Sequence, residues 1–389
     1  MKILILTFYF QPDLSAGAFR MTAFVDRLKG MLNSDDTVEI ITTSPNRYHA
    51  FEREAPEQEQ NDNIFIKRIK IPSHKSGMLD QSIAFTKYAR GCLKYSKNRK
   101  YDLVLATSSR LFTAFLGAVI SRRTKANLYL DIRDIFVETM EDILSGWKSL
   151  AIVPGLNLIE KLTVKSAKKI NLVSQGFESY FTKKYPSGLF SFYPNGIDSE
   201  FLNHNFEKTE SIDKTIILYA GNIGEGQGLH KIIPELARQL DDRYLIRIIG
   251  DGGAKNKLLQ ELNSFDDSKI ELVNPVGREV LIDYYKQSDF LFLHLNDLNA
   301  FKRVLPSKLF EYAATGKPVL AGVNGYAREF VDENIANSIT FTPCDADDLI
   351  AKLNDFESTN DKRSRFIERF SRDGLMDQLA QDFLDCTLH

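Results

Sequence analysis

The sequence predicts an α/β protein with two doubly wound domains, each built around a parallel sheet that helices cover on both faces. Short apolar runs alternate with amphipathic helical stretches throughout, and this alternation restarts after residue 190. The length of 389 residues suffices for two hydrophobic cores. We therefore expect domains at 1–190 and 191–360, followed by C-terminal helices at 361–389 that can pack back on the first domain.

The elements follow from the apolar pattern, taken in chain order. In the first half we expect strands at 3–7, 38–42, 64–69, 103–106, 127–132 and 169–173. Helices are expected at 17–32, 79–98, 110–122, 149–167 and 176–184. The turn signals of YPNGID, residues 193–198, mark the domain boundary. In the second half the expected strands are 215–220, 244–249, 270–272, 290–294, 318–321 and 338–341. The expected helices are 229–240, 254–263, 279–287, 307–314, 325–332, 346–355 and one or two within 361–385.

Composition restricts the class of protein. Three scattered cysteines show neither disulfide nor metal-ligand spacing, which favours a reducing cytoplasm. No apolar run approaches the length of a membrane span, and MKILILTFYF is expected to be a buried first strand rather than a signal core.

The net charge of −2 hides an asymmetry between the two halves. Residues 1–190 carry +9 and the remainder carries −11. The basic half indicates an anionic partner: a membrane surface or a phosphate-bearing acceptor fits, whereas no helix-turn-helix, zinc or aromatic signature supports nucleic acid.

The stretch PSKLFEYAATGKPVL, residues 306–320, is the strongest candidate for a site. Ser307 is expected to cap a helix that ends before Gly316. Lys308 in the first turn is disfavoured by the helix dipole unless an anion binds there, and Glu311 lies on the same side and can accept hydrogen bonds from sugar hydroxyls. A local Lys–Glu pair on a surface helix is the alternative.

Three further stretches follow strands, at the sheet edge where such folds bind ligands. YAGNIGEGQGL, residues 219–229, has four glycines in eight residues, and its amides can cradle a phosphate. Gly17 and Arg20 lie in YFQPDLSAGAFR, residues 9–20; a solvated arginine after a glycine loop is the alternative. In LDIRDIFVE, residues 130–138, Asp134 can act as a base or hold a hydroxyl, or pair structurally with Arg133.

Smaller features complete the pattern. IGDGG at 249–253 and VGR at 276–278 form tight turns near the same edge, with Arg278 able to reach a phosphate, although structural turns explain both. The basic helix at 79–98 is either a membrane-surface element or, as we favour, an ordinary packing helix with a solvated basic face.

In this order, the motifs resemble those of GT-B glycosyltransferases of the retaining family 4. Within it they are similar to the bacterial branch that transfers N-acetylated fucosamine-type or related sugars in O-antigen and capsule assembly. GNIG-x-x-QGL at 221–229 combined with PSK-x-x-EY-x-A-x-GKPV at 306–319 carries the resemblance, supported by the stretches at 9–20, 132–138, 192–198 and 249–253.

The resemblance implies a nucleotide-diphosphate sugar donor, expected to be a UDP-N-acetylated sugar, bound by the second domain without a metal ion. Glu311 matches the residue that binds the donor ribose, and Ser307 and Lys308 would hold the pyrophosphate with the glycine loop. The expected donor-binding residues are Gly221, Asn222, Gly224, Gln227, Gly228, Gly277, Arg278, Arg303, Ser307, Lys308, Leu309 and Glu311.

The first domain would bind a lipid-linked or glycan acceptor beside Gly17 and Arg20, at the cytoplasmic face of the membrane. Asp134 and Arg133 are the expected catalytic residues. The resemblance implies front-face transfer, in which the leaving phosphate helps to deprotonate the acceptor.

The chain departs from the family pattern at Arg303, which stands where relatives place the first glutamate of a pair. Asn222 and Gln227 stand where many relatives use Arg and Lys. Two other functions therefore stay open: a nucleotide-sugar 2-epimerase of the same architecture, and a nucleotide-sugar-binding subunit without catalysis.

Overall fold

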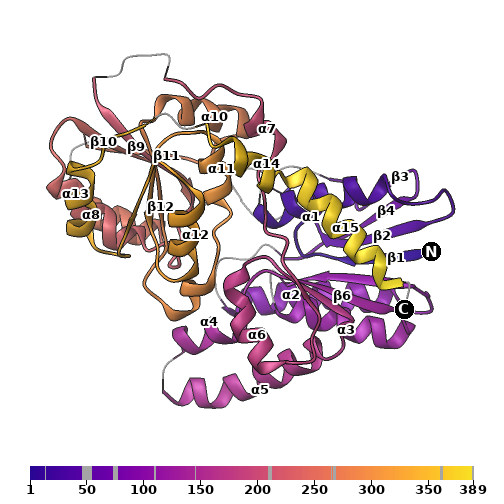
Figure 1. Cartoon of the computed structure of the whole chain (residues 1–389). Coiled ribbons are helices and arrows are strands. Elements are labelled where there is room, and N and C mark those ends of the chain that lie inside the picture. The colour runs from indigo at the N-terminus through magenta and orange to yellow at the C-terminus, as the bar shows by residue number, and fades with distance from the viewer. Residues whose placement is uncertain are drawn as a thin grey trace. The chain divides into compact units, whose positions relative to one another are not determined.

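The computed structural model describes residues 1–13, 15–45, 55–72, 78–108, 111–144, 146–208, 213–263, 265, 269–359 and 362–387. The chain forms two compact units (Figure 1). Unit 1 comprises Met1–Asn195 together with Arg372–His389, and unit 2 comprises Gly196–Ser371. The sequence-based boundaries lie at 190/191 and 360/361. In the structure the first boundary lies a few residues later, after Asn195, and the chain returns to unit 1 at Arg372.

Unit 1 is built on an eight-stranded sheet with the order β3-β4-β2-β1-β5-β6-β7-β8. Its strands are β1 (Lys2–Leu6), β2 (Thr37–Thr43), β3 (Gln58–Asn61), β4 (Ile64–Ile69), β5 (Leu103–Thr107), β6 (Asn127–Ile132), β7 (Lys169–Leu172) and β8 (Phe190–Ser191). Every pairing is parallel except that of β3 with β4. The central strand β5 is buried along its whole length because the sheet is covered on both faces.

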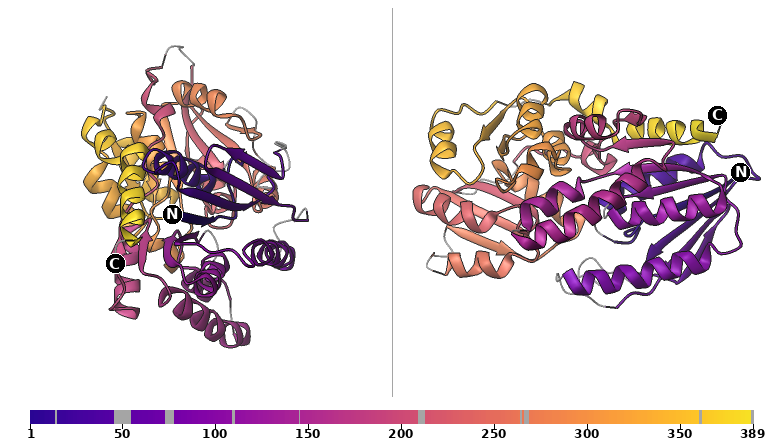
Figure 2. Two further views of the ribbon diagram at one scale, coloured as in Figure 1. Left: turned by 90° about the vertical axis from the view of Figure 1, so that its right-hand side faces the viewer. Right: turned by 90° about the horizontal axis from the view of Figure 1, so that it is seen from below.

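The helices of unit 1 connect these strands. They are α1 (Ala16–Lys29), α2 (Met78–Tyr95), α3 (Leu111–Thr124), α4 (Phe136–Ile143), α5 (Trp147–Val164), the 3₁₀ turn η1 (Gln175–Phe177), α6 (Glu178–Lys184), α15 (Arg372–Leu384) and η3 (Asp385–Thr387). Ser15 caps α1 by accepting a hydrogen bond from the amide of Ala18 at 3.2 Å. The C-terminal helix α15 lies beside α1, as both Figure 1 and Figure 2 show.

Unit 2 is a six-stranded parallel sheet with the order β11-β10-β9-β12-β13-β14. Its strands are β9 (Thr215–Asn222), β10 (Tyr244–Asp251), β11 (Ile270–Val273), β12 (Phe290–His294), β13 (Val319–Gly322) and β14 (Ser338–Phe341). Its helices are α7 (Ser199–Leu202), α8 (Leu229–Gln239), α9 (Lys255–Leu262), α10 (Arg278–Gln287), η2 (Asn299–Arg303), α11 (Lys308–Ala314), α12 (Tyr326–Asn334), α13 (Ala346–Asn354) and α14 (Ser364–Phe370). Figure 1 shows α8 and α13 on one side of the strands and α10, α11 and α12 on the other.

The predicted fold class is confirmed: both units are α/β layers on parallel sheets. Several elements lie outside the sequence expectation, among them β3, β8, α4 and α7. β3 is the polar edge segment QEQN, and β8 has only two residues. α4 follows Ile135, an N-cap residue that makes no side-chain cap, so no capping signal predicted this helix.

Candidate functional site

The glycine loop of unit 2 joins the carboxyl end of β9 to α8 and is braced from within. The side-chain oxygen Oε1 of Gln227 accepts hydrogen bonds from Nδ2 of Asn222 at 2.9 Å and from the amide of Gly224 at 3.2 Å. Tyr219 donates its hydroxyl to the carbonyl of Asn222 at 2.6 Å. Asn222 and Gln227, predicted as donor-binding residues, therefore bond to each other and hold the loop in one conformation.

Two glycines allow this loop to form. Gly228 adopts φ +60° in the left-handed region at the start of α8, where a side chain would be strained. At Gly250 a Cβ atom would overlap the carbonyl oxygen of Gly221, because β10 passes close to the end of β9. Gly250 of the IGDGG segment is thus required because β9 and β10 approach each other closely next to the loop.

A buried histidine on the neighbouring strand β12 fixes the loop from below. His294 is 1% exposed, and its Nε2 accepts a hydrogen bond from the amide of Cys344 at 2.8 Å. The proton must therefore lie on Nδ1, which donates to the carbonyl of Gln227 at 2.6 Å. Burial lowers the pKa of His294 to about 4, so the ring is neutral at physiological pH.

Asn296, two residues further on, holds the tip of the same loop. Its amide donates to the carbonyl of Gly226 at 2.8 Å, and its Nδ2 donates to the carbonyl of Glu225 at 3.1 Å. Neither His294 nor Asn296 was predicted as a site residue. The available signal was a histidine at the end of the apolar strand FLFLH and an asparagine two residues later, at the ligand-binding edge of the sheet.

Lys308, Glu311 and Tyr285 form a charged cluster next to the loop. Nζ of Lys308 lies 2.7 Å from Oε2 of Glu311 and 3.2 Å from the hydroxyl of Tyr285, which donates to the same carboxylate at 3.3 Å. The Lys308 side chain is 28% exposed and that of Glu311 is 10% exposed. Burial lowers the pKa of Lys308, but the charge of Glu311, the hydrogen bond to it and the neighbouring Tyr312 together raise that pKa above its usual value.

A hydrogen bond between α11 and β9 sets the distance between the cluster and the loop. The amide of Ala220 donates to the hydroxyl of Tyr312 at 3.1 Å. As a result, a Cβ atom at Gly221 would lie 3.8 Å from Cε of Lys308. An ammonium group, a carboxylate and the glycine loop thus meet at one edge of the sheet, a combination suited to an anionic ligand that carries hydroxyl groups.

The other predicted residues of unit 2 take different positions. Ser307 occupies the N-cap position with helical dihedral angles and makes no side-chain cap, so the expected serine cap is wrong. Leu309 is fully buried in the core, Arg303 ends η2 and is half-buried, and Gly277 precedes α10.

Arg278 starts α10 and is held by acidic residues. It forms ion pairs with Asp198 and, at 3.1 Å, with Glu200, and its guanidinium lies 5.3 Å from the ring centre of Phe201. Although burial lowers the pKa of Arg278, the neighbouring carboxylates, among them Glu311, raise it. Arg278 is thus a permanent cation in the electrostatic field of the cluster.

In unit 1, Arg20 is the centre of a buried network. It is 0% exposed and holds both carboxylate oxygens of Asp131, at 3.1 and 2.8 Å. It also donates to the carbonyls of Pro194 at 2.6 Å and Tyr193 at 2.9 Å. Burial opposes ionisation of Asp131, but Arg20 keeps its pKa below the usual value. All the nitrogen atoms of the guanidinium thus have protein acceptors, and Arg20 orders the YPNGID segment.

Arg133 and Asp134 follow β6 at the same edge of the unit 1 sheet. The guanidinium of Arg133 covers the α-carbon of Gly17, so a Cβ atom there would have to displace Nη1. Burial lowers the pKa of Arg133 to about 10. Burial also raises the pKa of Asp134 to about 7, against the opposing charge of Arg133. Oδ1 of Asp134 accepts no hydrogen bond from any residue that the structure describes.

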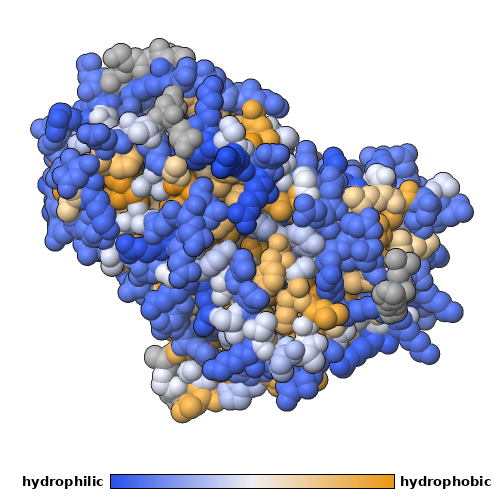
Figure 3. Space-filling model, viewed as in Figure 1, coloured by the Kyte–Doolittle hydropathy of each residue, from blue (hydrophilic) through white to orange (hydrophobic). Residues whose placement is uncertain are grey.

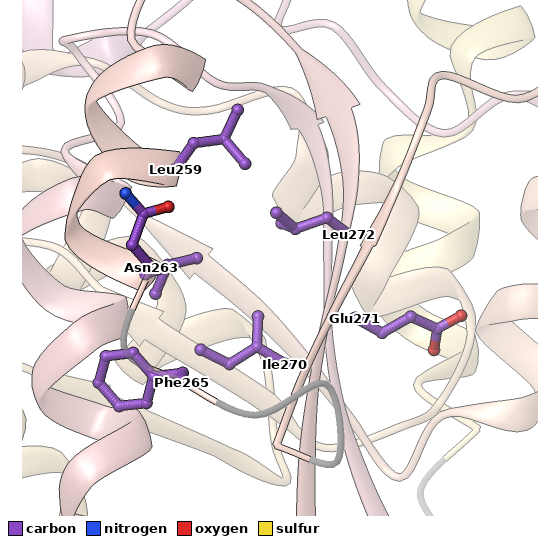
Figure 4. A pocket seen from close by; sticks show the side chains of 7 residues that line it. Leu259, Asn263, Phe265, Ile270, Glu271 and Leu272 are labelled. Atoms are coloured by element: carbon purple, nitrogen blue, oxygen red, sulfur yellow. The ribbon is translucent and has the colours of Figure 1, made fainter.

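A separate hollow lies between α9 and the edge strand β11. Leu259, Leu262, Phe265, Ile270 and Leu272 line it with Asn263 and Glu271, and Figure 4 shows these side chains around the opening. The carboxylate of Glu271 is paired with Arg247 at 2.6 Å. The edge strand β11 is two strands away from β9 in the sheet. The hollow is therefore not part of the candidate site.

The described residues contain no group of three or more His, Cys, Asp and Glu side chains placed to hold a metal ion. No helix among them is long and apolar enough to cross a membrane.

Comparisons with known proteins agree with this architecture. Residues 202–372 match the family model for glycosyl transferases group 1. WcaI of Escherichia coli K12, provisionally described as a colanic acid biosynthesis glycosyl transferase, is 25% identical over 244 residues. This alignment covers 58% of this chain, and the chain spans only 58% of the length of that relative.

Solved structures share the fold over nearly the whole chain. HepE of Anabaena in complex with UDP and glucose aligns with a TM-score of 0.68 at 17% identity, covering 99% of both chains. The catalytic domain of starch synthase IV of Arabidopsis thaliana, bound to ADP and acarbose, aligns with a TM-score of 0.67 at 13% identity, covering 100% of this chain and 99% of that one.

Residues 202–372, most of unit 2, are thus similar to a group 1 glycosyltransferase domain. The two parallel-sheet units share the fold of the solved structures.

Proposed function

We propose that this chain is a retaining glycosyltransferase that moves a sugar from a UDP-sugar, expected to be N-acetylated, to a lipid-linked or glycan acceptor in surface polysaccharide synthesis. The observation that carries the proposal is the cluster of Lys308, Glu311 and Tyr285 beside the braced glycine loop. The description of WcaI supports the polysaccharide context, and the UDP complex of HepE supports the donor.

Each part of the cluster has a proposed role in donor binding. The amides of Gly221, Gly224 and Gly228 and the ammonium of Lys308 would bind the pyrophosphate, since both supply donors to an anion. Glu311 would accept hydrogen bonds from the ribose hydroxyls, and Tyr285 would keep its carboxylate in place when the lysine turns to the phosphate. Arg278 would add a positive field to the same region.

The proposed reaction balances within these groups. The bond between the anomeric carbon and the β-phosphate oxygen breaks, and the acceptor oxygen forms the new bond on the same face. The acceptor proton passes to the departing phosphate, whose charge Lys308 stabilises. We propose that unit 1 binds the acceptor and that Asp134 orients the acceptor hydroxyl through its free oxygen Oδ1. The charge of Arg133 would lower the pKa of that carboxyl group. Arg20 then acts as a positioning residue for Asp131. The reaction is proposed to need no metal ion, so a chelator should not reduce it.

The decisive experiment has two stages. A thermal-shift panel with UDP, GDP, ADP and dTDP should show the largest stabilisation with UDP. The proposal fails if no nucleotide stabilises the protein.

Incubation with UDP-sugars and a lipid-linked acceptor, read by mass spectrometry and NMR, then tests transfer and anomeric retention. Release of an epimer without acceptor would indicate the epimerase, and binding with neither hydrolysis nor transfer would indicate a non-catalytic subunit.

A further inference from the structure

Helix α5 of unit 1 carries a row of apolar side chains in water. Leu150, Pro154, Leu158 and Leu162 recur at every fourth residue and therefore share one face, here called the α5 stripe. Leu150 is 81% exposed, Leu158 58% and Leu162 38%, and Ile143 at the end of α4 is 59% exposed. Figure 3 shows apolar surface along the lower edge of the molecule, where α5 runs in Figure 1. A continuous exposed apolar row of this kind marks an interaction surface.

The charged side chains on the solvent face of α5 are all positive. Lys148, Lys161 and Lys165 are exposed on the same helix and its C-cap, and no described carboxylate forms an ion pair with them. Glu160 is the only acidic residue of α5, and it faces the protein: it is 3% exposed and bound to Lys184 at 2.6 Å and to Tyr185 at 2.8 Å. The solvent face of α5 therefore combines leucines with unpaired lysines.

We propose that α5 docks unit 1 on an anionic lipid bilayer, with the stripe in the acyl boundary and the three lysines on lipid phosphates. A second copy of this chain is a poorer occupant, because a twofold contact would bring the lysines of one stripe against those of the other. The inference rests on the proposed function only in that a lipid-linked acceptor would give the docking its purpose.

The more basic helix α2 does not offer the same surface. Among the α2 side chains that the structure describes, the large apolar one that is exposed is Ile83, at 60%, whereas Ala84, Tyr88 and Cys92 are all fully buried. Lys87, Arg90 and Lys94 thus extend from an ordinary packing helix. The contrast makes α2 a matched internal comparison for α5.

Flotation of the full chain with vesicles tests the proposal. The protein should float with phosphatidylcholine vesicles that contain about one third phosphatidylglycerol and stay unbound with phosphatidylcholine alone. The double variant Leu150→Ser/Leu158→Ser should lower the bound fraction about tenfold or more. Lys148→Gln/Lys161→Gln/Lys165→Gln should lower it as well, which covers the case of a misfolded stripe variant. Leu189→Ser, at a leucine of unit 1 that is 63% exposed outside α5, should float like the wild type.

Four results would overturn the docking proposal: absence of flotation by the wild type, unchanged flotation of both α5 variants, loss of flotation with Ile83→Ser instead, or a dimer in ultracentrifugation that Leu158→Ser dissociates. The UDP thermal shift of every variant is measured in parallel. A UDP shift without flotation removes the docking proposal alone, and flotation without any nucleotide shift removes the proposed function alone.

Discussion

In the proposed donor site, Lys308 is the residue on which we expect binding to depend most. Asn222 and Gln227 bond to each other, and Arg278 is engaged by Asp198 and Glu200. The ammonium of Lys308, which is 28% exposed at the loop, is thus the cation best placed to leave its carboxylate partner for a phosphate. Its pairing with Glu311 keeps both side chains in position while no ligand is bound.

We expect Lys308→Ala to weaken UDP binding about tenfold to hundredfold, as measured by isothermal titration calorimetry, because a charge-assisted hydrogen bond to phosphate is lost. The fold should persist, since Tyr285 still donates to Glu311. Lys302→Ala is the matched control: this exposed lysine of η2 bonds to Asn299 at 2.9 Å and should leave UDP affinity unchanged. Equal affinity of Lys308→Ala and wild type would reduce the Lys308–Glu311 pair to a structural one.

His294 makes stability depend on pH with a definite sign. Its pKa is about 4 in the folded protein and about 6.5 in an unfolded chain. Above pH 6.5 neither state binds the proton, whereas between pH 6.5 and 4 the unfolded chain takes it up and the folded protein does not. The free energy of unfolding should therefore fall over this window, by at most about 3 kcal/mol from this group.

Urea unfolding at pH 7, 6 and 5 measures this effect. His294→Gln should be less stable than the wild type at pH 7, because it loses the bond to Gln227 or to Cys344, but its stability should fall less steeply toward pH 5. His204→Gln, at an exposed histidine, should keep the wild-type pH dependence. Parallel pH curves for wild type and His294→Gln would contradict the assignment.

Among the elements, the glycine loop combines rigidity with open amides. Gln227 braces it through an oxygen that accepts two hydrogen bonds, so glutamate at this position keeps both bonds and adds a negative charge. Gln227→Glu should therefore unfold at nearly the wild-type temperature but bind UDP about tenfold more weakly or worse, through repulsion of the pyrophosphate.

Gln287→Glu is the matched control for that variant. Oε1 of Gln287 also accepts a hydrogen bond, from Arg247 at 3.1 Å, but Gln287 lies at the carboxyl end of α10, at the opposite edge of the sheet. The UDP affinity of Gln287→Glu should be unchanged. If Gln227→Glu also binds UDP normally, the pyrophosphate does not lie at the glycine loop.

The elements also show which signals the sequence carries. The ranges of β4, β6 and β12 match their predictions because each is an apolar run bounded by turn residues. β3 is polar and exists because its backbone pairs with β4 at the sheet edge, which is a tertiary effect. Similarly, the sequence predicted a helix at 149–167, and only the structure shows that Leu150 and Leu158 of α5 face water.

Across the whole molecule, long-range pairings were beyond prediction. Arg20 and Asp131 are 111 positions apart, so Arg20 was predicted as a residue of the ligand edge rather than as one half of a buried pair. The order of the glycine loop and α11 along the chain predicted their common edge, since both adjoin parallel strands. The contact of Tyr285 with Glu311 depends on the packing of α10 against α11 and had no sequence signal.

The return of the chain to unit 1 predicts how the two units unfold. Met376, Leu379 and Phe383 of α15 are fully buried, and the ring of Phe383 lies 5.7 Å from those of both Phe24 and Tyr129. Deleting residues 372–389 removes this part of the core of unit 1, at a cost comparable to the stability of a whole domain. Calorimetry should show the transition of unit 1 lost or strongly lowered, with that of unit 2 retained.

Two single substitutions separate the units in the same measurement. Phe383→Ala should destabilise unit 1 by about 3–5 kcal/mol. Phe370→Ala, one position from the end of unit 2 and packed on Phe310 and Phe330, should lower the transition of unit 2 instead. Because the two phenylalanines lie only 13 positions apart but belong to different cores, opposite responses would show that the chain crosses between units at Arg372. Two unchanged transitions in the deletion protein would mean that α15 adds nothing to the core of unit 1.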